Sequence, residues 1–325
     1  MDACDFLSLE KPVLQGAMGG VARQDLVVAV SEAGGLGTLS YLPPAFFESE
    51  LRCIEERLEG KTFAANLLMP LISRLHVEAC LKSSVQVVTL FYGFDQAIVS
   101  ALKDAGKLVL FQIGSLEEAE LVLSAGADGV IVQGYEAGGH LRGEERLAEL
   151  LPKVRTCFPD ALICGAGGIH NKDTAEVCRS SGADAVCAGT RFLASPEASA
   201  HPEFKRRLVT ATETIVTDLF GVGWRDLHRV IPNSAVKKWC ARDSSDHAFA
   251  PMTDAAEKLV SGLSDAVDRA AILMRQSLEQ PIYTPSSLTP ELEATMIEYV
   301  ALYAGECVQN IHELQPVPKS VELLS

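Results

Sequence analysis

The stretch LVLFQIGSLEEAELVLSAGADGVIVQ, residues 108–133, contains one complete strand–helix–strand unit. Its two apolar runs, Leu108–Gln112 and Gly129–Gln133, do not alternate with polar residues, which is typical of parallel strands buried on both faces. Between them, Leu116–Ala125 has the pattern of an amphipathic helix, and Ser115 stands at its N-cap position. The unit therefore predicts parallel strands joined by helical crossovers.

The same alternation runs through the first 190 residues. Further strands are predicted at Pro12–Gln15, Leu36–Leu39, Thr62–Leu67, Gln86–Leu90, Ala161–Cys164 and Ala185–Ala188, and further helices at Gln24–Glu32, Glu48–Leu58, Asp95–Ala105 and Asp173–Ser180. The connection Leu123–Asp128 is echoed by Arg179–Asp184, and in both a glycine ends the helix before the next strand. Eight strand–helix alternations favour a closed (β/α)₈ TIM barrel over an open sheet.

The pattern changes after about His201, so we expect the barrel to occupy residues 1–205. Residues 206–287 predict a smaller, mainly helical region that covers the substrate, with helical character over 234–280. Within 288–325, a last helix from about Glu291 to Val308 is expected to return to the barrel.

Composition excludes several classes of function. The 325 residues carry a net charge of −15 and the pI is about 4.9, which disfavours binding to nucleic acids and to anionic membranes. The sequence has no apolar run long enough to span a bilayer and no secretion signal at its N-terminus. The nine cysteines are dispersed, without a Cys-x-x-Cys pair, which favours reduced thiols in a cytoplasmic protein.

Glycines gather directly after several predicted strands, at Gly16–Gly20, Gly134–Gly139, Gly165–Gly168 and Gly189. Such positions lie on the C-terminal face of a barrel, where clustered glycine indicates backbone pressed against a ligand. The loops after the last two strands commonly bind phosphate in barrels, and here they contain Gly167 and Gly168, then Gly189 and Thr190. On these loops alone the ligand could be any phosphorylated molecule, and tight turns without a ligand are the alternative.

Among the seven histidines, His140 is the candidate catalytic residue because it follows two glycines at a strand end. A turn-capping histidine is the alternative, and no second ligand at suitable spacing supports a metal. Asn66 and Gln112 end two other strands, where each amide could contact a cofactor or tie a loop. Trp224 and His228 could line the substrate region or pack in the core.

With these loops in view, the sequence resembles the nitronate monooxygenase (2-nitropropane dioxygenase) family, which is similar to the flavin-dependent enoyl-ACP reductases. The resemblance runs from about residue 11 to 240 and weakly through Leu302–Glu306. Its carriers are Gln15–Gly19, Ser31–Gly37, Ala125–Asp128, Gln133–His140, Gly165–Ile169 and Ala188–Phe192. Thr89–Gly93 is closer to the monooxygenase branch than to the reductase branch.

This resemblance implies a non-covalent FMN. Gly16, Ala17 and Met18, with Asn66 and Gln112, would contact the isoalloxazine and the ribityl chain. Gly138 and Gly139 would approach the ring edge, while Gly167, Gly168, Gly189 and Thr190 would hold the phosphate. The family histidine that matches His140 is catalytic. One departure is that Leu141 and Arg142, rather than a single residue, separate His140 from Gly143, on what we expect to be the substrate side.

The reaction implied by the resemblance is oxidation of a nitronate or nitroalkane by FMN and O₂ to a carbonyl compound and nitrite. An NAD(P)H-dependent enoyl(-ACP) reductase and an NAD(P)H:quinone reductase use the same FMN site and remain alternatives. A flavin-binding protein without catalysis is the alternative from another class, although it would have no need for a histidine at the ring edge.

Overall fold

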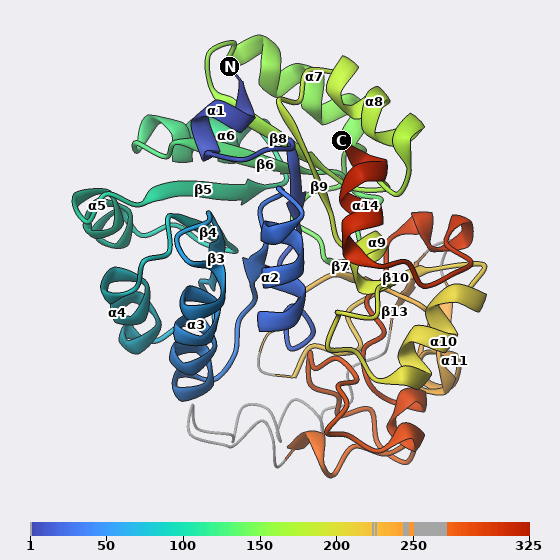
Figure 1. Ribbon diagram of the computed structural model, residues 1–325. Helices are drawn as coiled ribbons and strands as arrows, with labels where there is room; N and C mark the ends of the chain where they lie inside the picture. The colour runs from blue at the N-terminus through green and yellow to red at the C-terminus, as the bar shows by residue number, and fades with distance from the viewer. Residues whose placement is uncertain (1, 223, 225, 243–246, 250–271) are drawn as a thin grey trace.

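Eight parallel strands close into a barrel. The strands are β1 (Val13–Gln15), β2 (Thr38–Leu39), β3 (Ala64–Leu68), β4 (Val87–Phe91), β5 (Leu108–Ile113), β6 (Gly129–Gln133), β8 (Leu162–Ala166) and β9 (Ala185–Ala188). They are ordered β1-β9-β8-β6-β5-β4-β3-β2, and a parallel bridge between Leu14 and Leu36 joins the two ends. The predicted (β/α)₈ barrel is confirmed. This computed structural model describes residues 2–222, 224, 226–242, 247–249 and 272–325 (Figure 1).

Helices surround the strands, as Figure 1 shows. They are α2 (Gln24–Glu32), α3 (Pro44–Leu58), α4 (Arg74–Lys82), α5 (Gln96–Asp104), α6 (Leu116–Ser124), α7 (Leu147–Cys157), α8 (Lys172–Ser180) and the short α9 (Thr190–Leu193). The predicted caps form: Ser115 Oγ accepts the Glu118 N–H over 3.2 Å. The two echoed connections also agree, since Gly126 and Gly182 have φ of +94° and +114°.

Strand residues are buried on both faces, which explains their apolar sequences. In β4, for example, Val87 packs inside the barrel and Val88 packs against the surrounding helices. The short helix α1 (Ala3–Leu7) joins the inner cluster near the strand starts through Leu7. Because α1 closes that end, the ligand site is left to the loops at the C-terminal end.

A small antiparallel sheet, ordered β10-β11-β7, lies beyond the end of β6. It consists of β10 (Ile215–Thr217), β11 (His228–Val230) and β7 (Gly139–His140). Helices α10 (Pro202–Thr210) and α11 (Ser234–Trp239) flank it in sequence, and β12 (Ala241–Arg242) pairs with β13 (Ala248–Phe249). The described part of the region 206–287 thus contains strands that the sequence did not predict. Part of the predicted helical stretch 234–280 lies outside the described residues.

The predicted helix from Glu291 to Val308 is wrong in its limits. This segment holds two 3₁₀ helices, η1 (Ala294–Glu298) and η2 (Glu306–Asn310), separated by extended chain. Residues 300–302 are consecutively buried, and Ala301 and Tyr303 form bridges to Ser287 and Val230, so tertiary pairing replaces helical hydrogen bonds. The final helix is α14 (Val317–Leu324), which lies beyond the predicted one and contacts α2, α8 and α9 (Figure 1).

None of the helices in the described part of the chain combines the length and the apolar character that crossing a bilayer requires. Within the same residues, no group of three or more His, Cys, Asp or Glu side chains is placed to hold a metal ion. The division of the chain at residues 205 and 287 stays a prediction.

Candidate functional site

The loops after β1, β6, β8 and β9 are held to one another at the C-terminal end of the barrel. The Gly16 N–H donates to the last carbonyl of β9 over 2.9 Å, and the Gly134 N–H donates to the last carbonyl of β8 over 2.8 Å. Gly167 and Gly168 then turn with φ of +128° and +69°, which side chains with a β-carbon rarely adopt. The loop after β1 therefore lies beside the end of β9, and the loop after β6 lies beside the end of β8.

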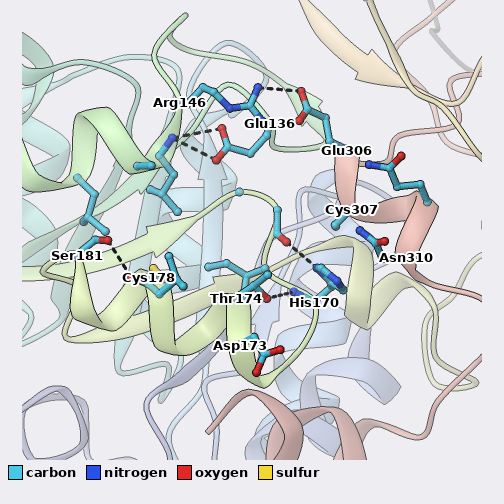
Figure 2. A pocket seen from close by; sticks show the side chains of 18 residues that line it. Glu136, Arg146, His170, Asp173, Thr174, Cys178, Ser181, Glu306, Cys307 and Asn310 are labelled. Carbon is cyan, nitrogen blue, oxygen red and sulfur yellow. Dashed lines mark hydrogen bonds and ion pairs between the residues drawn. The ribbon is translucent and has the colours of Figure 1, made fainter.

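Gly167 and Gly168 line a cavity of about 370 Å³ between α7, α8 and η2 (Figure 2). Gly189 and Thr190 do not belong to its lining. Instead, Thr190 Oγ1 accepts the N–H of Gly305 over 2.9 Å. Because Gly305 directly precedes η2, which forms one wall of the cavity, Thr190 lies behind this wall rather than in the cavity itself.

Charged residues that the sequence did not single out also line the cavity (Figure 2). Glu306 forms ion pairs with Arg146 at 2.5 Å and with the buried Arg229 at 3.3 Å. The carboxylate of Glu136 accepts the N–H of Leu147, with both oxygens at 3.2 Å. Glu306 lies in the segment with weak family resemblance and Glu136 in the motif Gln133–His140, whereas Arg146 lies in none of the motifs.

The loop that carries His140 is fixed by two side chains. Gln133 Nε2 donates to the His140 carbonyl over 2.9 Å, and Gln133 Oε1 accepts the Arg142 N–H over 3.0 Å. The Tyr92 hydroxyl donates to the Leu141 carbonyl over 2.5 Å. Tyr92 itself has φ of +65°, a strained conformation for a residue with a β-carbon, of the kind that clusters at functional sites. Both residues lie in motifs that carry the family resemblance, but sequence reasoning gave neither of them a role in the site.

Aromatic rings surround the His140 imidazole. Trp224 stacks on it, with ring centroids 3.7 Å apart and planes 9° apart. The centroids of His228 and Tyr303 lie 5.2 Å and 5.5 Å away. The His140 side chain is partly exposed as a whole, but its Nε2 is buried and has no hydrogen-bond partner among the described residues. Trp224 and His228, which the sequence left between substrate region and core, both lie against the candidate catalytic residue.

Burial, and then the nearby His228, hold the pKa of His140 well below its usual range. His140 is therefore a neutral imidazole at pH 7, able to accept a proton. His228 is fully buried, and burial lowers its pKa to about 4. Its Nδ1 donates to the Asp226 carbonyl over 2.9 Å, and its Nε2 accepts the Phe220 N–H over 3.3 Å, so its hydrogen-bonding capacity is already satisfied.

The glycines that precede His140 differ in their surroundings. A β-carbon on Gly138 would lie 2.4 Å from the Gly305 nitrogen, so this glycine is required by close packing against the C-terminal segment. Gly139 has φ of +79°, and a β-carbon there would meet nothing within 4 Å. The space beside Gly139 is consequently open for a ligand, while Gly138 contacts protein.

The remaining candidates lie on or directly after other strands, and the expectation that Asn66 ends its strand is wrong, because β3 continues to Leu68. Asn66 Nδ2 donates to the Thr89 carbonyl over 3.2 Å and to its hydroxyl over 3.0 Å, which ties β3 to β4. Gln112 is partly buried on β5. Gly16–Met18 follow β1, and a β-carbon on Gly189 would lie 3.8 Å from Met18 Sδ. The segment after β1 therefore lies beside the loop after β9.

The additional residue between His140 and Gly143 packs away from the imidazole. Arg142 forms an ion pair with Glu118 of α6, and its guanidinium lies 4.9 Å from the centroid of the Tyr92 ring. Arg142 therefore contacts Tyr92, whose ring in turn lies 6.0 Å from the His140 ring.

Known proteins resemble the chain in sequence and in fold. The sequence pattern of the family described as nitronate monooxygenase matches residues 2–76 and 71–277. A probable nitronate monooxygenase of Bacillus subtilis is 30% identical over 66% of this chain and 75% of its own length. The (3aS,4S,5R,7aS)-5-hydroxy-7a-methyl-1-oxo-octahydro-1H-indene-4-carboxyl-CoA dehydrogenase of Rhodococcus jostii is 31% identical over 71% of this chain. The match spans 66% of that dehydrogenase, slightly less than two thirds of its length.

Two solved structures extend the likeness over nearly the whole chain. A nitroalkane oxidase of Streptomyces ansochromogenes superposes with a TM-score of 0.77 at 27% identity, covering 100% of this chain and 96% of its own. FabK of Thermotoga maritima gives a TM-score of 0.75 at 28% identity, covering 99% and 93%. The family match implies an oxidoreductase with a flavin cofactor. By its sequence pattern and its fold, the chain belongs to the nitronate monooxygenase family.

Proposed function

We propose that the protein binds FMN at the C-terminal end of the barrel and oxidises a nitronate or nitroalkane with O₂, giving a carbonyl compound and nitrite. The observation that carries this proposal is the buried Nε2 of His140, which has no hydrogen-bond partner among the described residues. Bound FMN supplies the redox chemistry of the reaction. The residues of the chain bind, orient and deprotonate the substrate.

The residues at the barrel end fit such a cofactor. Gly139 leaves open space beside His140, and Gly167 and Gly168 expose their backbone to a cavity. The His170 Nδ1–H donates to the Gly168 carbonyl over 2.9 Å, which fixes the orientation of this loop. Backbone N–H groups in turns of this kind bind phosphate. We therefore infer that Gly167 and Gly168 hold the FMN phosphate, with Gly189 and Thr190 on the adjacent loop.

The assignments to the ring and ribityl chain rest on position. Gly16, Ala17 and Met18 follow β1, Asn66 lies within β3, and Gln112 is the last but one residue of β5. These strands open onto the same face of the barrel, where the five residues would contact the isoalloxazine and the ribityl chain. The amide nitrogen of Asn66 already donates to Thr89, so Asn66 would contact the cofactor through its amide oxygen. FMN, rather than FAD, is proposed because the sequence has no second nucleotide-binding motif.

His140 would act on the substrate through Nε2. The neutral imidazole can accept the α-proton of a nitroalkane or hydrogen-bond the oxygens of a nitronate. Trp224, stacked on the ring at 3.7 Å, and the clamp of Gln133 and Tyr92 hold the imidazole in one orientation and exclude water from one of its faces.

The test is to identify the cofactor and then reduce it without oxygen. Heat denaturation should release FMN, and chromatography that shows FAD, or no flavin after attempted reconstitution, would contradict the proposal. Under nitrogen, a nitronate should bleach the absorbance of the oxidised flavin, whereas NADH alone should not.

A CoA thioester oxidoreductase is the second candidate, because the Rhodococcus jostii relative is named as a carboxyl-CoA dehydrogenase. Bleaching by a CoA thioester, and not by a nitronate, would favour it. Bleaching by NADH would favour an enoyl(-ACP) or quinone reductase instead. A protein whose flavin none of these compounds reduces would be a flavin-binding protein.

A further inference from the structure

The small sheet places Tyr303 beside His140 on the same side of the site. On β11, His228 pairs with His140 and Val230 forms an antiparallel bridge with Tyr303. His228 and Val230 are two residues apart along a strand, so their side chains point to the same face, and directly paired residues share that face. The distance of 5.5 Å between the His140 and Tyr303 rings agrees with this geometry.

These two side chains each have a buried polar atom that lacks a hydrogen-bond partner. The Tyr303 hydroxyl and His140 Nε2 are both buried, and neither has a hydrogen-bond partner in the described part of the chain. A buried polar group without a partner destabilises the folded protein, so such groups are rare and call for an explanation. Two of them on neighbouring rings indicate that a ligand completes their hydrogen bonds.

The polar atoms around this pair are satisfied, so poor packing of the whole cluster is not the reason. His228 uses both ring nitrogens, and the Tyr92 hydroxyl donates to the Leu141 carbonyl. Among the rings that contact His140, the Tyr303 hydroxyl and His140 Nε2 itself are the buried polar atoms for which the described residues supply no partner.

The protonation states of the pair are complementary. Burial raises the pKa of Tyr303 far above neutral pH, so its hydroxyl keeps its proton and is a hydrogen-bond donor. Burial lowers the pKa of His140, so its imidazole is neutral and can accept a proton. One group can therefore stabilise negative charge while the other receives the proton whose removal creates that charge.

We propose that Tyr303 is a substrate-binding catalytic residue whose hydroxyl donates a hydrogen bond to a nitro or nitronate oxygen while His140 faces the α-carbon. This assignment rests on the proposed function. In the deprotonation of a nitroalkane, the C–H bond breaks, the proton moves to Nε2, and the electron pair is delocalised onto the nitro oxygens. Tyr303 then stabilises the oxygen on which the charge develops. An anion that carries an oxygen within reach of the Tyr303 hydroxyl, such as nitrite, should therefore bind at this site.

The test compares Tyr303→Phe with Tyr299→Phe as the matched control. Both changes remove one hydroxyl from the same segment, but Tyr299 has no ring contact with His140 among those found in the structure. Titration calorimetry of the FMN-loaded protein with sodium nitrite measures anion binding without turnover, and steady-state kinetics with a nitroalkane measures kcat/KM.

Tyr303→Phe should weaken nitrite binding and lower kcat/KM, each by about 10- to 100-fold, the range expected for a hydrogen bond to a charged group. Tyr299→Phe should change neither. FMN content should stay the same, and Tm should stay equal or rise, because a desolvated hydroxyl without a partner has been removed. If Tyr303→Phe does not accumulate, Tyr303→Met removes the same hydroxyl with an adaptable side chain.

The outcomes separate the two proposals. The inference is overturned if the wild-type protein binds no nitrite, or if Tyr303→Phe binds nitrite and turns over nitroalkane as well as the wild type does. Nitrite binding that depends on Tyr303, in a protein that oxidises no nitronate or nitroalkane, would support the anion site and contradict the proposed function. Nitronate oxidation that is independent of Tyr303 would support the proposed function and contradict the role of Tyr303 in binding the anion.

Discussion

At the scale of single residues, His140 combines a lowered pKa with a buried Nε2 that has no partner among the residues the structure describes. We expect His140→Ala to keep its fold and its FMN but to lose turnover by about 10²- to 10⁴-fold, the usual contribution of a positioned acid or base. If the imidazole acts as a base, the loss should be larger with neutral nitroalkanes than with preformed nitronates. If it mainly binds the anion, both substrates should suffer and KM should rise. Unchanged kcat/KM with every substrate that reduces the flavin would make His140 a structural residue.

His228 predicts how stability depends on pH. Its folded-state pKa of about 4 lies below the usual value near 6.5, so the unfolded chain binds more protons between these two values. The free energy of unfolding should therefore fall as pH drops from about 6.5 to 4, by about 3 kcal/mol from this residue. Urea titrations at several pH values measure the slope. The glutamine in His228→Gln has no titrating group in this pH range. If the free energy of unfolding of this variant falls as steeply with pH as that of the wild type, His228 is not the cause.

At the scale of elements, the clamp on the His140 loop predicts a separation between activity and stability. Gln133→Met keeps the length of the side chain but removes its bonds to the His140 carbonyl and the Arg142 N–H. We expect a loss of about 1–3 kcal/mol in stability, together with a fall in kcat that exceeds the change in KM.

Gln86→Met is the matched control. Gln86 also ties a loop, through the Phe63 N–H at 3.2 Å, but just before β4 at the opposite end of the barrel. The Gln86→Met variant should be less stable than the wild type and should keep the same kcat. An equal fall of kcat in both variants would show that general destabilisation, rather than the position of His140, is responsible.

The elements also show how far sequence reasoning reaches. Leu108–Gln112 and Gly129–Gln133 were predictable as strands because burial on both faces leaves an uninterrupted apolar run, and they are found as β5 and β6. The structure of the segment Glu291–Val308 was not predictable, because Ala301 and Tyr303 pair with Ser287 and Val230, which are distant from them in the sequence. The same reason hides the partners of His140. Trp224, His228 and Tyr303 reach it only through the tertiary structure, and no local spacing records that contact.

At the scale of the whole molecule, the proposed phosphate cavity is built from distant parts of the chain. The loop after β8 meets helices α7 and α8 on one side and η2 on the other, and Thr190 is joined to Gly305 behind that wall. At Gly168, an added β-carbon would meet Glu136 Cγ at 3.3 Å and no residue of the apolar clusters. Cofactor binding and the stability of the barrel should therefore be separable by mutation.

Gly168→Asp tests this separation. The new carboxylate would oppose the phosphate charge and block the backbone N–H groups, and its β-carbon would lie 3.3 Å from Glu136 Cγ, so FMN retention should be lost while the barrel stays folded. Gly106→Asp is the matched control, because Gly106 has a similar φ of +74° and open space around it, at the opposite end of the barrel. Both variants place aspartate in a left-handed conformation, which destabilises each of them by about 1–2 kcal/mol. A difference in FMN retention between the two variants therefore reports on the phosphate site. Flavin absorbance per protein and far-ultraviolet circular dichroism measure the two effects. Full FMN in Gly168→Asp would place the phosphate elsewhere on the barrel.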